Sequence, residues 1–301
     1  MKTLLTLCLG CFLLTKAVTT RAADAPNFTR VEDVIYGRKY GTALTMDVFK
    51  PTQTNNACGV IFMVSGGFSS GHEFMNLGFF RPFLDRGYTV FAVVHGSQPK
   101  FVIPEIEEDI HRAVRFIRHN AAAYGVDPHR LGITGASSGG HLTLTIATQG
   151  RPSRPEASDP VDKESSVVQA AACFFPPTDF LNWGADGVDA VGVGPLAGFK
   201  PAFGPRSDTP ESRQIYGKDI SPLNFLTANL PPTLIIHGTA DRLVPLQQSQ
   251  IFVKRANDLH VAHVKLIERE GKDHGWPGIE KELAIFADWF DVYLRGLPAK
   301  E

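Results

Sequence analysis

Short apolar runs alternate with stretches of helical periodicity along most of this chain. The apolar runs predict strands, which lie at 60–64, 88–94, 131–134, 167–175, 233–236 and 263–267. Apolar positions three or four residues apart predict helices between them, at 77–86, 106–124, 141–148, 246–259 and 279–294. Two earlier segments, 31–36 and 44–49, alternate like paired strands joined near Gly41. The order predicts an α/β fold with a mostly parallel sheet and helices on both of its faces.

The first 23 residues have a different pattern. A positive residue, Lys2, precedes an apolar run at 4–14, and the small residues Ala22 and Ala23 follow. These features are typical of a secretory signal peptide over 1–23, so we expect a secreted or periplasmic protein. The rest of the chain, 24–301, shows no linker and no internal repeat, which predicts a single domain.

Helical and strand periodicity both disappear between 181 and 205, where six glycines fall within 25 residues. Long segments without periodicity are often functional, so we expect a loop or cap insertion at about 181–217. Four aromatic side chains in or beside it either line a substrate pocket or anchor the loop: Phe180, Trp183, Phe199 and Phe203.

Composition excludes several classes of protein. Charged residues make up 20% of the 301 residues and the formal net charge is −1, so a nucleic-acid partner is not expected. After the leader, no apolar stretch reaches the roughly 18 residues that a membrane-spanning helix needs. Residues 24–301 contain no CxxC or HExxH motif, and we expect neither a metal site nor a cofactor.

The strongest chemical motif is Gly135-Ala136-Ser137-Ser138-Gly139, a G-x-S-x-G match. It directly follows a predicted strand and directly precedes a predicted helix, which is the setting of a nucleophile elbow. In such a sharp turn the close neighbours must be glycine, and the serine hydroxyl is lifted clear of the backbone. We therefore expect Ser137 to be a nucleophile.

A serine nucleophile needs a base, and the base needs a carboxylate to orient it. His274 is the best-placed histidine, because it follows the last predicted strand between two glycines. Asp241 follows the strand before it, and the order Ser137, Asp241, His274 is the order of α/β-hydrolases. Asp179, which follows the strand at 167–175, is the alternative acid.

Acyl transfer also requires backbone donors for the oxyanion. The N–H of Ser138 is one candidate. The other donor is expected from the Ser65-Gly66-Gly67-Phe68 segment after the strand at 60–64, where Gly67 and Phe68 both remain candidates.

Together these motifs resemble the α/β-hydrolase superfamily, and more narrowly the secreted bacterial esterase and lipase group akin to hormone-sensitive lipase and to acetyl-xylan or feruloyl esterases. The matching segments span nearly the whole mature chain: LTMDVFKP at 44–51, VSGGF at 64–68, VDPHRLGITGASSGG at 126–140, HGTADRLVP at 237–245 and DHGWP at 273–277. One departure is Ser65, which stands where the family's oxyanion loop usually begins with histidine. Its anchoring hydrogen bond must therefore be made differently here.

The resemblance implies an eight-stranded sheet of order 1-2-4-3-5-6-7-8. In that order Cys58 and Cys173 are separated by two strand spacings, about 9.5 Å, which is too far for a disulfide. We therefore expect two free, buried thiols.

The expected function is carboxylic ester hydrolysis, by an esterase or lipase that forms an acyl-enzyme. Resemblance and the leader favour short-chain acyl groups or carbohydrate-linked esters as substrates. Two alternatives remain open. One is a peptidase of the prolyl-oligopeptidase type, although its usual propeller domain has no room here. The other is a non-catalytic binding protein with a hydrolase fold, although such lineages generally lose a member of the triad.

Overall fold

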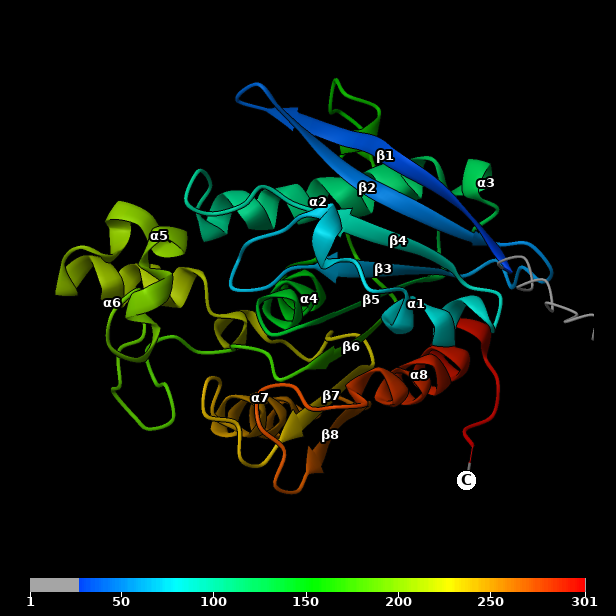
Figure 1. The fold of residues 1–301 in the computed structure, drawn as a ribbon. Helices are drawn as coiled ribbons and strands as arrows, with labels where there is room; N and C mark the ends of the chain where they lie inside the picture. Colours follow the sequence, from blue (N-terminus) through cyan, green and yellow to red (C-terminus); the bar gives the residue numbers. More distant parts are fainter. Residues whose placement is uncertain (1–26, 301) are drawn as a thin grey trace, which may run out of the picture.

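The computed structural model describes residues 27–300, and the expected leader lies outside them. Eight strands form one sheet in the order β1-β2-β4-β3-β5-β6-β7-β8, as the resemblance implied (Figure 1). Strand β2 runs antiparallel to both of its neighbours, and all the other pairs from β4 to β8 are parallel. The strands are β1 (Phe28–Lys39), β2 (Thr42–Pro51), β3 (Gly59–Val64), β4 (Thr89–Val94), β5 (Leu131–Ala136), β6 (Ala170–Phe174), β7 (Thr233–Gly238) and β8 (Val264–Arg269).

Helices cover both faces of this sheet, and each contributes an apolar side to a core. Helices α1 (Leu77–Leu84) and α8 (Leu283–Arg295) pack on one face, where buried phenylalanines of both helices and two alanines of β6 belong to one cluster. Helices α2 (Ile103–His119), α4 (Ser138–Gln149) and α7 (Gln247–Asp258) pack on the other face (Figure 1). The central strands are buried on both faces, which explains their nearly continuous apolar runs.

The helix expected at 106–124 is divided in the structure. Helix α2 begins earlier, at Ile103, so that Pro104 lies in its first turn, where a missing N–H costs no hydrogen bond. It ends at His119, and Asn120 leaves the helical conformation before the short helix α3 (Ala121–Tyr124). The strand expected at 167–175 is also shorter, because only the five residues of β6 pair with neighbouring strands.

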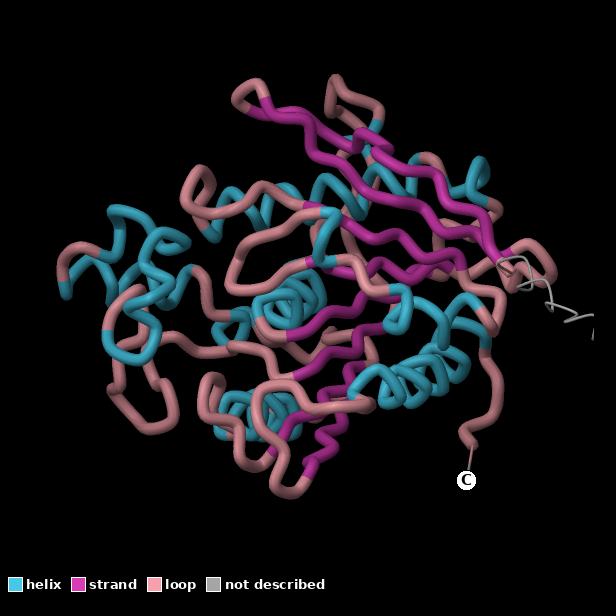
Figure 2. Tube along the Cα trace, viewed as in Figure 1, coloured by secondary structure: helices cyan, strands magenta, loops and turns pink. Residues whose placement is uncertain are grey.

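The segment expected as a loop from 181 contains several short helices (Figure 2). They are 3-10 helices at Gly194–Phe199 and Gly204–Ser207, and the α-helices α5 (Lys200–Phe203) and α6 (Pro210–Asp219). The first three are too short to produce a visible periodicity, yet Leu196, Ala202 and Phe203 are buried in the same core as α2 and α4. The insertion is therefore packed against the domain by its own apolar residues.

Two further expectations concern cysteines and membranes. Cys58 and Cys173 are both free and buried, as predicted. Within residues 27–300, none of the helices combines the length and the apolar character that crossing a membrane would require.

Candidate active site

Ser137 lies at the sharp turn between β5 and α4. Its backbone has φ 56° and ψ −121°, a conformation that L-residues rarely adopt and that carries strain. A side chain at Gly135 would place its Cβ 2.5 Å from the carbonyl oxygen of Gly139, and a side chain at Gly139 would meet the carbonyl oxygen of Met63 at 2.9 Å. Both flanking positions therefore require glycine, which is the steric reason for the G-x-S-x-G pattern.

Two other sequence candidates meet Ser137 in space. The Nε2 atom of His274 lies 2.9 Å from the Ser137 hydroxyl, and its Nδ1 atom lies 2.8 Å from Oδ2 of Asp241. An ionised carboxylate can only accept, so Nδ1 carries the proton and donates it to Asp241. Nε2 is then left with a lone pair facing the Ser137 hydroxyl. This is the arrangement that a general base requires.

The environment of Asp241 favours its ionised form. Burial by itself would raise the pKa of this carboxyl, but contacts from the His237 and His274 rings, together with the Val244 N–H, hold the pKa well below its usual range. The N–H groups of Leu243 and Val244 donate to Oδ1 at 2.9 and 2.8 Å. Asp241 is thus a fixed negative charge beside His274.

The alternative acid is engaged elsewhere. Asp179 accepts hydrogen bonds from the Leu181 N–H at 2.9 Å and from the Asn182 side chain at 2.7 Å. It stabilises the chain reversal after β6, and the ring of His274 bonds to Asp241 instead.

Backbone donors surround the same serine. Gly66 and Ser69 bond to each other through both of their peptide groups, at 2.9 and 3.0 Å, and so close a tight turn over Gly67 and Phe68. These two central residues have φ of 56° and 63°. Among residues 27–300, the N–H groups of Gly67, Phe68 and Ser138 have no hydrogen-bond acceptor. We call residues 65–69 the 65–69 turn.

A small apolar cavity adjoins this turn. Its free volume is about 30 Å³, and its lining is Gly67, Phe68, Ser137, Ser138, Pro177, Trp183, Leu196, Phe199, Leu243 and Val244. The aromatic residues of the insertion divide into two groups. Trp183 and Phe199 line the cavity, whereas Phe180 and Phe203 are fully buried behind it and pack edge to face at 5.3 Å. Pro177 and Leu196 carried no sequence signal, and Leu243 and Val244 were noted only as part of the segment at 237–245. The place of all four in the lining depends on where the loops fold.

Comparison with known proteins places this geometry in a family. The BD-FAE family model matches residues 46–256, which is more than half of the chain. The chain belongs to the BD-FAE family. The match includes Ser137 and Asp241 and ends before His274. With its sheet order and serine turn, this BD-FAE chain is an α/β-hydrolase.

Individual relatives of this BD-FAE member include named esterases. A probable carboxylic ester hydrolase of Mycobacterium tuberculosis, LipM, is 27% identical over 251 residues, which cover 81% of this chain and 56% of LipM. This chain thus spans about half the length of the curated relatives it matches. A truncated carbohydrate esterase from gut microbiota has a TM-score of 0.77 at 25% identity, over 91% of this chain and 99% of that one. An esterase of Thermogutta terrifontis with bound butyrate has a TM-score of 0.68 at 26% identity, over 92% and 97%.

In this BD-FAE chain Ser65, which stands in place of the histidine of the usual His-Gly-Gly start, is anchored by its own hydrogen bonds. The Ser65 hydroxyl lies 2.8 Å from Nε2 of His95 and 2.9 Å from the Ser138 hydroxyl. His95 is buried, and its Nδ1 lies 2.7 Å from the Gly96 carbonyl oxygen, so Nδ1 is the donor and Nε2 accepts from Ser65. The anchoring hydrogen bond is therefore made differently, as expected, by a histidine that directly follows β4.

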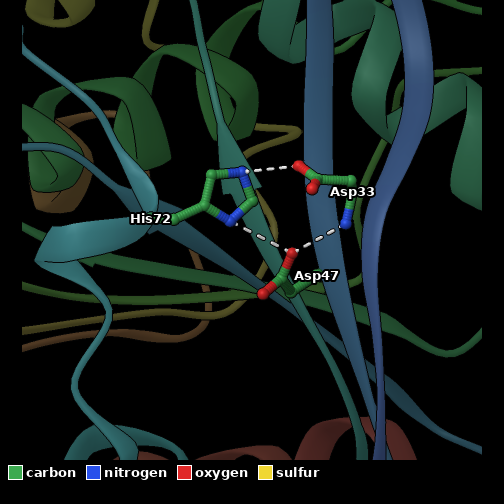
Figure 3. Close-up of side chains that lie close together, drawn as sticks. All are labelled: Asp33, Asp47 and His72. Atoms are coloured by element: carbon green, nitrogen blue, oxygen red, sulfur yellow. Dashed lines mark hydrogen bonds and ion pairs between the residues drawn. The ribbon is translucent and has the colours of Figure 1, made fainter.

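One cluster of possible ligand residues lies away from Ser137. Asp33, Asp47 and His72 offer atoms that lie within 4.8 Å of one another (Figure 3). The two ring nitrogens of His72 lie 3.1 and 3.2 Å from Asp33 and Asp47, and Arg30 donates to the buried Asp47 at 2.7 Å. Because these carboxylates already have protein partners, we interpret the cluster as a tie between the β1–β2 pair and the segment after the 65–69 turn.

Proposed function

We propose that this protein is a serine esterase that cleaves carboxylic esters through an acyl-enzyme. The observation that carries the proposal is the continuous hydrogen-bonded chain from Ser137 through His274 to Asp241, beside three unpartnered backbone N–H groups. Named esterases among its relatives support the same reaction class.

The first half-reaction forms the acyl-enzyme. Nε2 of His274 takes the hydroxyl proton as Ser137 Oγ attacks the ester carbonyl carbon. Asp241 stabilises the imidazolium that results. The N–H of Ser138 and that of Gly67 or Phe68 donate to the oxyanion. His274 then gives its proton to the departing oxygen, the carbon–oxygen bond breaks, and the alcohol leaves.

The second half-reaction returns the enzyme to its starting state. A water molecule gives its proton to His274 and attacks the acyl carbon, and the same N–H groups bind the second oxyanion. The bond to Ser137 breaks, Ser137 recovers the proton from His274, and the carboxylic acid leaves. Every proton moves among the side chains, the alcohol and water.

The cavity beside Ser137 supports one class of substrate. The cavity is small and apolar, and Trp183 and Phe199 are among its lining residues, which supports short acyl groups. The butyrate-bound relative supports the same size range, and the carbohydrate esterase supports a carbohydrate as the alcohol. The apolar leader at 4–14 supports secretion or transfer to a periplasm, where such esters are met.

Hydrolysis of p-nitrophenyl acetate, butyrate and octanoate by the purified protein and by Ser137→Ala tests this function. Loss of the nucleophile is expected to lower kcat on the order of a millionfold. Ser153→Ala, at an exposed serine in the polar loop before β6, is the matched control and should retain full activity. Equal activity in Ser137→Ala and the unchanged protein would refute the assignment of the nucleophile. A folded but inactive unchanged protein would favour a non-catalytic hydrolase fold.

A further inference from the structure

The segment that follows β4, residues 95–98, lies along the 65–69 turn and bonds to it repeatedly. His95 holds Ser65, as described above, and Ser97 Oγ accepts from the Ser70 N–H at 2.7 Å. Gln98 contacts the centre of the turn twice. Its backbone N–H donates to the Phe68 carbonyl oxygen at 3.1 Å, and its side-chain Nε2 donates to the Gly67 carbonyl oxygen at 2.7 Å.

The second of these contacts controls the direction of a possible oxyanion donor. The carbonyl of Gly67 and the N–H of Phe68 belong to one planar, trans peptide group, in which C=O and N–H point in opposite directions. A hydrogen bond that fixes the Gly67 oxygen therefore also fixes where the Phe68 N–H points. Donation to the oxygen further polarises the peptide and strengthens its N–H as a donor.

The neighbouring peptide group, between Gly66 and Gly67, is held in place without a bond from Gln98. The N–H of Gly67 shares its peptide with the Gly66 carbonyl, which the Ser69 N–H binds at 3.0 Å within the turn itself. The peptide between Gly67 and Phe68 has no partner of this kind inside the turn. It is also flanked by two residues of positive φ, and Phe68 at φ 63° is a strained position for an L-residue. Its orientation therefore depends on a group from outside, and that group is Gln98.

We propose that Gln98 is a positioning residue that directs the Phe68 N–H toward the oxyanion in the transition state. The inference rests on the proposed esterase function and extends it, since it assigns Phe68 as the second donor. Glutamine suits this role because its neutral amide donates to a carbonyl at a fixed distance. An ionised carboxylate of the same shape has no proton to donate and would repel the Gly67 oxygen.

Gln98→Glu tests the proposal, with kcat and KM measured on p-nitrophenyl acetate. Loss of a whole oxyanion donor costs about 10²–10³ in kcat, and a misdirected donor should cost about 10- to 100-fold. KM is expected to stay within about 2-fold, because the interaction is made with the transition state. As the pH falls toward 5, the introduced carboxyl gains a proton and can donate again. The ratio of variant to unchanged kcat should then rise.

Two further variants separate positioning from mere support of the turn. Gln98→Met keeps the side-chain length without a donor, and it should show the same loss of kcat with no recovery at low pH. It also serves if Gln98→Glu does not fold. Ser97→Ala removes two hydrogen bonds to Ser70, directly after the 65–69 turn, and should leave kcat nearly unchanged. Thermal unfolding of each variant checks that the fold persists.

Several outcomes would overturn the proposal. They are an unchanged kcat in folded Gln98→Glu or Gln98→Met, a Gln98→Glu ratio that does not vary with pH, or an equal loss of kcat in Ser97→Ala. Failure of the esterase function itself would be distinguishable, because the unchanged protein would then be inactive or Ser137→Ala would remain active.

Discussion

Replacing Asp241 by asparagine changes one atom of the hydrogen-bonded chain and should reverse its direction. Oδ1 of Asp241 accepts from two backbone N–H groups, so the asparagine oxygen is retained at that position. The amide nitrogen then takes the place of Oδ2, which lies 2.8 Å from Nδ1 of His274. An NH₂ group at that site can only donate, so Nδ1 must accept and the ring proton moves to Nε2. Nε2 then faces Ser137 as a donor and cannot take its proton.

The size of the effect follows from what is lost. The base is in the wrong tautomer, and no negative charge remains to stabilise an imidazolium. The same replacement in a serine protease triad lowers kcat by about 10⁴. We expect a loss of about 10³- to 10⁴-fold here, which corresponds to about 4 to 5.5 kcal/mol in the activation free energy. KM should change little, because Asp241 does not contact the substrate in the proposed mechanism.

The assay is the steady-state hydrolysis of p-nitrophenyl acetate at pH 7, with Asp179→Asn as the matched control. Asp179 binds Leu181 and Asn182, so its replacement should lower kcat by no more than about 3-fold. A loss below 10-fold in Asp241→Asn would refute the reasoning. A larger loss in folded Asp179→Asn than in Asp241→Asn would assign the acid to Asp179.

Three other properties can be tested. Phe199→Ala should widen the cavity and raise the rate of octanoate hydrolysis relative to acetate hydrolysis by at least about 10-fold. Phe203→Ala should leave that rate ratio unchanged and lower the free energy of unfolding in urea by about 3–5 kcal/mol. Equal rate ratios in the two variants would contradict the assignment of Phe199 to the cavity lining and of Phe203 to the anchor. Burial lowers the pKa of His95 to about 4, so the unfolded chain takes up a proton between pH 6.5 and 4 while the folded protein does not, and stability falls with pH across that range. Between pH 7.5 and 5 the free energy of unfolding of the unchanged protein should fall by about 2 kcal/mol more than that of His95→Gln. An identical fall in both proteins would refute this effect of His95. Burial raises the pKa of the Cys58 and Cys173 thiols, so iodoacetamide at pH 8 should label them only after denaturation. Peptide mapping that finds either thiol rapidly labelled in the native protein would contradict this burial.

The strands of the sheet and the serine turn could be predicted from local sequence because each depends on near neighbours. A strand buried on both faces must be apolar throughout, and the runs at 60–64 and 88–94 lie within a residue of β3 and β4. The turn at Ser137 leaves no space for a Cβ at the flanking glycines, so its geometry appears directly as a G-x-S-x-G motif. The prediction of a single helix at 106–124 was wrong, because one non-helical residue, Asn120, does not interrupt the spacing of the apolar positions.

The insertion shows where local patterns stop being informative. Its short helices bury one or two residues each, so no period accumulates, and the sequence could only indicate a loop from 181. Which aromatic residues line the cavity and which anchor the insertion depends on how the insertion packs against the rest of the domain. Only the folded chain separates Trp183 and Phe199 from Phe180 and Phe203.

By itself, then, the sequence determined the fold class, the serine at the end of β5 and the short set of residues that could act with it. It left open which carboxylate faces His274, because Asp241 and Asp179 both follow strands and differ only in where their side chains bond. The tertiary structure decided that choice. It also decided the contact of Gln98 with the Gly67 carbonyl, which joins residues 31 positions apart. Such contacts depend on how loops from different strands pack together at one edge of the sheet. The pattern of residues within any single segment does not determine that packing.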